Sequence, residues 1–214
     1  MKYNFDEVVN RRGTDCTKWD NLAARMGNAN ALPLWVADCD FKCSKPIQDA
    51  ILNRAKHPVF GYSFVPPEFF QATRNWVLRR HGWEISVDDV RFFPGVVPFI
   101  GVCIRVLTEP GSKILIQAPV YHPFATMIRE NGRVPYPCPL VYQNNKYSID
   151  FDALDQALAD PAVGMMILCN PHNPIGRVYR LDELERINEL CLKHGVVLVS
   201  DEIHSDVIYP GHKH

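Results

Sequence analysis

The feature that most constrains this chain is an alternation of short apolar segments with amphipathic segments from residue 90 onward. The apolar segments predict strands at residues 90–93, 113–117, 134–137, 164–169 and 196–200. The segments between them carry apolar residues at helical spacing, which predicts helices at 98–107, 123–131, 151–158 and 181–194. Short apolar strands between amphipathic helices predict an α/β fold with a parallel-type sheet covered by helices on both faces.

The first ninety residues follow a different pattern. Residues 1–45 mix Trp, Pro, Asp and Cys with little periodicity, apart from a short helical pattern at 21–26, and they predict an extended arm. Two helices follow, at 46–56 and 68–81, separated by a turn-rich aromatic stretch. We therefore expect an N-terminal arm and the start of a small domain at 1–45, and the N-terminal part of a large domain at 46–214.

Charge and cysteine content narrow the class of function. The chain has 23 basic and 24 acidic residues, a formal charge of -1, which argues against electrostatic binding of nucleic acid or an anionic membrane. Its seven cysteines are an odd number without a C-x-x-C pair, as expected for reduced thiols in a cytosol. The N-terminus has no apolar signal region, and no stretch approaches the roughly 18 apolar residues of a membrane helix. These features predict a soluble cytoplasmic protein that acts on small molecules.

Polar residues follow two of the predicted strands directly. The strand at 164–169 continues into Asn-Pro-His-Asn-Pro-Ile-Gly at 170–176, and the strand at 196–200 continues into Asp-Glu-Ile-His at 201–204. Ligands bind at the carboxyl ends of strands in parallel sheets of this kind. The sequence therefore predicts a site at that edge of the sheet.

Six segments taken together carry a family resemblance, at residues 34–41, 60–62, 94–97, 118–121, 170–176 and 200–204. In their order and spacing they resemble the fold-type-I pyridoxal 5′-phosphate (PLP) enzymes. The chain is most similar to the carbon–sulfur β-lyase branch of the class I/II aminotransferase-like enzymes, the cystathionine β-lyases related to the maltose-regulon modulator. The resemblance implies the aspartate aminotransferase fold, with the large domain incomplete in this chain.

The resemblance also implies a cofactor, a substrate and an assembly. The cofactor would be PLP, and the amino-acid substrate would be cystathionine or a cysteine S-conjugate, cleaved to a thiol, pyruvate and ammonia. A homodimer with shared active sites is the expected assembly. A class I/II aminotransferase is the alternative, because the two activities share their cofactor residues. A second alternative is a non-catalytic regulatory or binding fragment.

Three residues are expected to surround the pyridine ring. Asp201 would stabilise the protonated ring nitrogen, because a buried carboxylate favours a neighbouring cation; a helix N-cap or surface turn is the alternative. Asn173 has an amide that can donate a hydrogen bond to the phenolate oxygen of the ring, and a plain Asn-Pro turn is the alternative. Tyr121 would stack on the ring, although a tyrosine after a strand could equally pack in the core.

The remaining cofactor residues concern the phosphate and the edge of the site. Gly95, Val96 and Val97 precede a predicted helix, and their backbone N–H groups could bind the phosphate. By resemblance, Tyr62 reaches the phosphate in the neighbouring subunit; an ordinary interface or core tyrosine is as plausible from the sequence. His204 could support Asp201 or the phenolate, with a structural histidine as the alternative.

Two acidic residues are candidates for the substrate side. Asp38 and Asp40 lie where the N-terminal segment of the family closes over the substrate, although solvated carboxylates are the simpler interpretation. The His-Lys-His sequence at 212–214 resembles the continuation of the family, so no metal is assigned to it.

The resemblance places the Schiff-base lysine on a later strand, in a Ser-Lys pair beyond residue 214. None of the nine lysines present occupies the matching position. The arginine that binds the substrate carboxylate would also lie beyond this chain. We therefore expect no catalytic residue within these 214 residues, and expect the chain by itself to be inactive.

Overall fold

The computed structural model describes residues 3–214, which divide into two compact units, one up to Phe64 and the other Val65–His214. Each unit is described by itself. The predicted division after residue 45 falls inside the first unit, so the helix that follows residue 45 groups with the arm. The domain limits of the complete protein remain a prediction.

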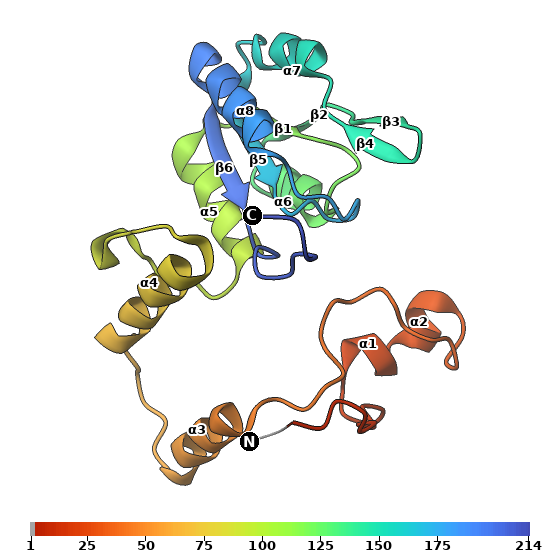
Figure 1. Ribbon diagram of the computed structural model, residues 1–214, viewed down its shortest axis with the longest axis vertical. Coiled ribbons are helices and arrows are strands. Elements are labelled where there is room, and N and C mark those ends of the chain that lie inside the picture. The colour runs from red at the N-terminus through yellow and green to blue at the C-terminus, as the bar shows by residue number, and fades with distance from the viewer. Residues whose placement is uncertain (1–2) are drawn as a thin grey trace. The chain divides into compact units, whose positions relative to one another are not determined.

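The first unit holds three helices among its described residues, α1 (Thr17–Asp20), α2 (Leu22–Met26) and α3 (Lys45–Lys56). A single residue separates α1 from α2, and a long segment without regular structure joins α2 to α3, as expected for an arm (Figure 1). The predicted helices at 21–26 and 46–56 are confirmed to within one residue.

The second unit contains the sheet. Its helices are α4 (Pro67–His81), the 3₁₀ turn η1 (Val87–Asp89), α5 (Val96–Leu107), α6 (Pro123–Glu130), α7 (Phe151–Leu158) and α8 (Leu181–His194). Its strands are β1 (Lys113–Ile116), β2 (Val134–Pro137), β3 (Val141–Gln143), β4 (Lys146–Ser148), β5 (Val163–Cys169) and β6 (Val197–Asp201). Four of these strands form a parallel sheet in the order β2-β1-β5-β6. Across residues 3–214, no helix has the length and apolar character to cross a bilayer.

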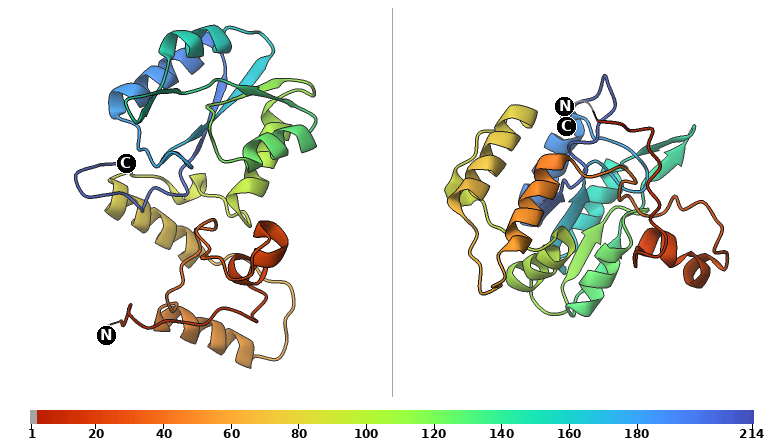
Figure 2. Two further views of the ribbon diagram at one scale, coloured as in Figure 1. Left: turned by 90° about the vertical axis from the view of Figure 1, so that its right-hand side faces the viewer. Right: turned by 90° about the horizontal axis from the view of Figure 1, so that it is seen from below.

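Helices cover both faces of the four-stranded sheet, because successive side chains of a buried strand point to opposite faces. Ile114 and Ile116 of β1 pack in one apolar cluster with residues of α5 and α6. Leu115 packs in the other cluster with residues of α7 and α8. Figure 2 shows the sheet between these two helix layers. The predicted parallel sheet with helices on both faces is therefore confirmed.

The structure corrects the prediction in two places. The strand predicted at 90–93 is wrong: this segment has no strand partner among the described residues, and its aromatic rings pack against helix side chains instead. The Phe92 ring lies edge-on to Phe69 of α4 at 5.5 Å, and the Phe93 ring lies 5.5 Å from Phe99 of α5. The second difference is the antiparallel β3–β4 hairpin, at residues where the sequence predicted no strand.

Candidate functional site

The candidate site lies at the carboxyl edge of the parallel sheet. Because β1, β5 and β6 are parallel, the polar residues at or directly after their ends, Gln117, Asn170 and Asp201, lie along one edge. Helix α5 runs back to the opposite edge, where β1 begins, so its first turn, at Gly95, also lies at the carboxyl edge. The structure thus places the segments that carry Gly95, Tyr121, Asn173 and Asp201 at one edge of the sheet.

Asp201 is the last residue of β6 and is only 6% exposed. Its Oδ1 accepts a hydrogen bond of 3.1 Å from the Ile203 N–H. Burial raises the pKa of the Asp201 carboxyl, and no Lys or Arg of the described chain forms an ion pair with it. A buried carboxylate without a counter-charge is unfavourable. The position therefore suits a ligand that carries a positive charge.

Asn173 is held close to this carboxylate through Cys169, the register partner of Asp201 on β5. The Asn173 backbone N–H donates to Cys169 Sγ at 3.5 Å, and the Asn170 N–H donates to the Asp201 carbonyl at 3.0 Å. Burial raises the pKa of the Cys169 thiol to about 11, so it stays protonated at neutral pH. The loop that carries Asn173 is thus attached to the strand end that carries Asp201.

Tyr121 is half-buried, and its ring is fixed by the core. It packs edge-to-face with the fully buried Phe124 of α6, with ring centroids 5.7 Å apart. Tyr121 therefore packs in the core, which was the alternative that the sequence left open. Because the ring is only half-buried, part of it stays accessible for stacking. The stacking role itself remains a prediction.

The first turn of α5 combines an unusual glycine conformation with free donors. Gly95 has φ 110° and ψ 148°, and no side chain caps the helix. The N–H groups of Val96 and Val97 therefore have no partner within the helix. Val96 packs against the apolar cluster that includes Cys169, which fixes this turn beside the strand ends. Such a turn has the donors and the helix dipole that a phosphate needs.

Two predicted cofactor residues remain, His204 and Tyr62. His204 is half-buried in the turn after β6, and its charged form lowers the pKa of Asp201. Tyr62 belongs to the first unit, in the loop after α3, and its side chain is fully exposed there. Its predicted role toward a neighbouring subunit stays a prediction.

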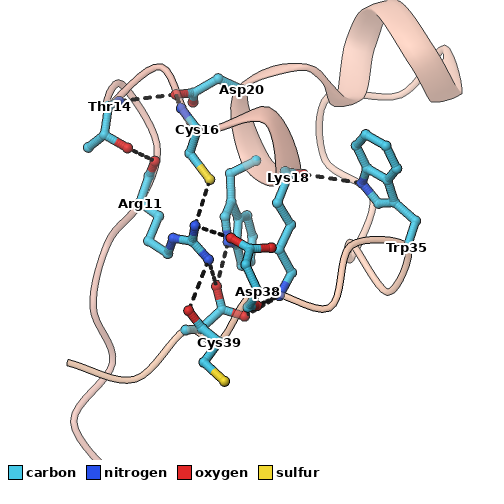
Figure 3. A network of polar contacts seen from close by, with 10 residues as sticks. Arg11, Thr14, Cys16, Lys18, Asp20, Trp35, Asp38 and Cys39 are labelled. Carbon is cyan, nitrogen blue, oxygen red and sulfur yellow. Dashed lines mark hydrogen bonds and ion pairs between the residues drawn. The ribbon is translucent and has the colours of Figure 1, made fainter. Parts of the chain in front are cut away.

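The two predicted substrate residues already have cationic partners inside the first unit (Figure 3). Asp40 accepts from Arg11 Nη1 at 2.7 Å, from Lys18 Nζ at 2.7 Å and from Trp19 Nε1 at 2.8 Å. Asp38 forms an ion pair with Arg11 Nη2. The hydrogen bonds from Lys18, Trp19 and Arg11 hold the pKa of Asp40 well below its usual range. These contacts give both carboxylates a structural role, and contact with substrate remains a prediction.

This network predicts a local effect of Asp40→Asn. Loss of the carboxylate leaves the buried Lys18 ammonium without its ionic partner, so hydrogen exchange of backbone amides in residues 11–40 should become faster at pH 7. Because the folded pKa is depressed, the stabilisation is present above the ordinary value of 3.8 and is lost as the pH falls through the folded pKa. Asp49→Asn, which breaks an exposed pair with Lys45, is the control. Equal exchange in the two variants would contradict this role.

Several polar residues near the candidate site were not identified from the sequence. Gln117 is 2% exposed, and its Oε1 has no partner within the described part of the chain. It directly follows the buried strand β1, the same signal that identified Asp201, so the sequence could have indicated it. His172 and Tyr179 form a buried hydrogen bond of 2.8 Å, and no local pattern in the sequence predicts that pairing.

Two curated proteins match this chain over nearly all of its residues. The cystathionine beta-lyase PatB of Bacillus subtilis is 44% identical over 211 residues, which cover 99% of this chain and 54% of the relative. The protein MalY of Escherichia coli is 38% identical, over 99% of this chain and 55% of the relative. The chain therefore spans about half the length of the curated relatives it matches.

Solved structures agree with these relatives. Cystalysin from Treponema denticola, whose structure contains a pyridoxal 5′-phosphate cofactor, matches 100% of this chain and 55% of its own with a TM-score of 0.93 and 34% identity. The PLP-bound C-S lyase from Staphylococcus hominis matches the same shares with a TM-score of 0.91 and 30% identity. The predicted fold is thereby confirmed. Residues 32–214 match the aminotransferase class I and II family, and the chain belongs to that family.

Proposed function

We propose that the complete protein is a PLP-dependent carbon–sulfur β-lyase, which cleaves cystathionine or a related cysteine S-conjugate to a thiol, pyruvate and ammonia. The observation that carries the PLP assignment is the buried Asp201 carboxylate without a cationic partner among the residues described. The lyase assignment is supported by relatives named cystathionine beta-lyase and C-S lyase. When bound, PLP supplies an electron sink for the negative charge that forms at the substrate Cα.

Asp201 would hold a proton on the ring nitrogen of the cofactor. The residue is almost fully buried, and its carboxylate accepts a hydrogen bond from the Ile203 N–H, which orients it. In such surroundings a cation beside the carboxylate is strongly favoured, because the pair neutralises a charge that is otherwise costly to bury. The cationic ring nitrogen is what makes the cofactor an effective electron sink.

The other residues would bind and orient the cofactor. The N–H groups of Val96 and Val97 would donate to its phosphate, with the positive end of the α5 dipole behind them. The Asn173 amide would donate to its phenolate oxygen, and the Tyr121 ring would cover one ring face. Such contacts fix the orientation of the ring, and hence the substrate bond that is broken.

We also propose a cytoplasmic homodimer in which Tyr62 of one protomer reaches the phosphate site of the other. The full exposure of Tyr62 within its own unit leaves its hydroxyl free for that contact. The seven cysteines are all free thiols, as expected in a reducing compartment.

The rate of pyruvate release, compared with the rate of amino transfer, tests the lyase assignment. Purified complete protein, given PLP and cystathionine, is expected to release pyruvate at least about tenfold faster than it transfers an amino group from a panel of amino acids to a keto acid. Both reactions begin by removal of the Cα proton. A thiolate at Cβ then leaves before the proton is returned, provided the Cβ–S bond is well oriented.

Alanine, which has no leaving group at Cβ, gives the background rate of amino transfer. A tenfold excess of transamination over pyruvate release would contradict the lyase assignment and support the aminotransferase alternative.

A further inference from the structure

One buried histidine joins two loops at the carboxyl edge of the sheet. His172 is 1% exposed, and its Nε2 lies 2.9 Å from the carbonyl oxygen of Pro119. A carbonyl can only accept a hydrogen bond, so Nε2 carries the ring hydrogen. The other ring nitrogen, Nδ1, lies 2.8 Å from the Tyr179 hydroxyl and must accept from it. The neutral ring therefore has both nitrogens satisfied.

The two hydrogen bonds of His172 connect segments that carry predicted cofactor residues. Pro119 lies two residues before Tyr121, in the loop after β1. His172 itself directly precedes Asn173, in the loop after β5. The loops come from neighbouring strands, but no backbone pairing of β1 with β5 continues beyond Ile116. The imidazole thus provides a direct polar link between them where the ladder has ended.

Tyr179 anchors the outer side of this link. Its backbone N–H donates to Asn170 Oδ1 at 3.1 Å, and its ring lies under the Arg177 guanidinium at 4.9 Å. Arg177 in turn forms an ion pair with the buried Glu183 of α8. The backbone and the ring of Tyr179 are therefore held by the end of β5 and by the start of α8. These contacts keep the Tyr179 hydroxyl in position to donate to His172.

We propose that His172 is a positioning residue of the cofactor site, whose two hydrogen bonds hold the Tyr121 loop and the Asn173 loop in fixed register. The inference rests on the proposed function, because that function assigns Tyr121 and Asn173 to PLP. The neutral form that these hydrogen bonds require is also the form that burial favours. Burial lowers the pKa of His172, so the ring stays neutral and Nδ1 can accept from Tyr179.

The test compares cofactor affinity with stability in the complete protein. His172→Phe keeps a ring but removes both nitrogens, Tyr179→Phe removes only the hydroxyl, and His172→Gln restores one donor and one acceptor. Leu154→Ala, at a fully buried residue of α7 in the apolar cluster that also contains Tyr179, is the control for a general loss of stability. For each variant, the PLP dissociation constant is measured by absorbance titration and the melting temperature is measured without cofactor.

We expect His172→Phe to raise the PLP dissociation constant about tenfold, Tyr179→Phe about threefold, and His172→Gln less than His172→Phe. Leu154→Ala should lower the melting temperature while changing the dissociation constant by less than about twofold. If His172→Phe does not fold, Tyr179→Phe decides the question by itself. Wild-type dissociation constants in the variants, or an equal rise in Leu154→Ala, would overturn the positioning role alone. A wild-type protein without saturable PLP binding would overturn the proposed function and this inference with it.

Discussion

In the complete protein, Asp201→Asn is expected to lower the rate of pyruvate release from cystathionine by at least about a hundredfold. The substitution keeps the size of the side chain and an acceptor for the Ile203 N–H, but it removes the negative charge. A cationic ring nitrogen would then be buried without a partner, which costs several kcal/mol, about 3–5 for a broken buried pair. The electron sink is weakened by the same change.

Glu202→Gln is the matched control, since it removes the neighbouring carboxylate. Glu202 is exposed, it accepts from Ser200 Oγ at 2.9 Å, and its other carboxylate oxygen lies 3.3 Å from His214 Nε2. We expect its activity to stay within about threefold of wild type, as for most exposed positions. Equal losses in the two variants would remove the assignment of Asp201 to the pyridine nitrogen.

The same Asp201→Asn change should have the opposite sign on stability when PLP is absent. Burial raises the folded pKa of Asp201 above its ordinary value of 3.8, so its ionised form destabilises the folded state as the pH rises through that folded pKa. An amide carries no such charge. Cofactor-free Asp201→Asn should therefore unfold at a higher urea concentration than wild type at pH 7, and at an equal concentration below pH 3.8. A lower urea midpoint at pH 7 would contradict the uncompensated burial of this carboxylate.

The parallel sheet could be predicted because its central strands are covered on both faces. Residues 163–169 form a continuous apolar run, and only burial from both sides requires such a run. A similar signal misleads at 90–93, where the apolar Phe92 and Phe93 pack their rings against α4 and α5 and form no backbone ladder. The β3–β4 hairpin escaped prediction because its strands are short and almost entirely exposed, so no apolar period marks them.

In the candidate site, too, features that depend on local sequence could be predicted, and contacts between distant residues could not. Asn173 and Asp201 could be identified because each closely follows an apolar strand, and that position is visible in the sequence. The pairing of Arg11 with Asp38 and Asp40 joins residues 27 and 29 positions apart, and the bond from His172 to Pro119 spans 53 positions. Contacts of this kind arise only when the chain folds, so local composition and periodicity do not reveal them.

Gly95→Ala is expected to weaken PLP binding by about thirtyfold, or about 2 kcal/mol. The φ of 110° and ψ of 148° at Gly95 lie in a region that is essentially restricted to glycine. An added Cβ would lie 3.4 Å from Pro98 Cδ, which is an ordinary van der Waals distance, so the strain comes from the backbone conformation and is relieved by rotation of the backbone. That rotation displaces the Val96 and Val97 N–H groups, which are the proposed phosphate donors.

Gly82→Ala separates this effect from simple backbone strain. Gly82 also has a left-handed φ, 68°, but it ends α4, and an added Cβ there would meet no atom within 4 Å. Both variants should lose stability, while only Gly95→Ala should lose affinity for PLP. Pyridoxal, which lacks the phosphate, extends the test: its dissociation constant should be nearly the same for Gly95→Ala and wild type. If pyridoxal binding falls as much as PLP binding, the first turn of α5 supports the site in some other way and is not the phosphate site.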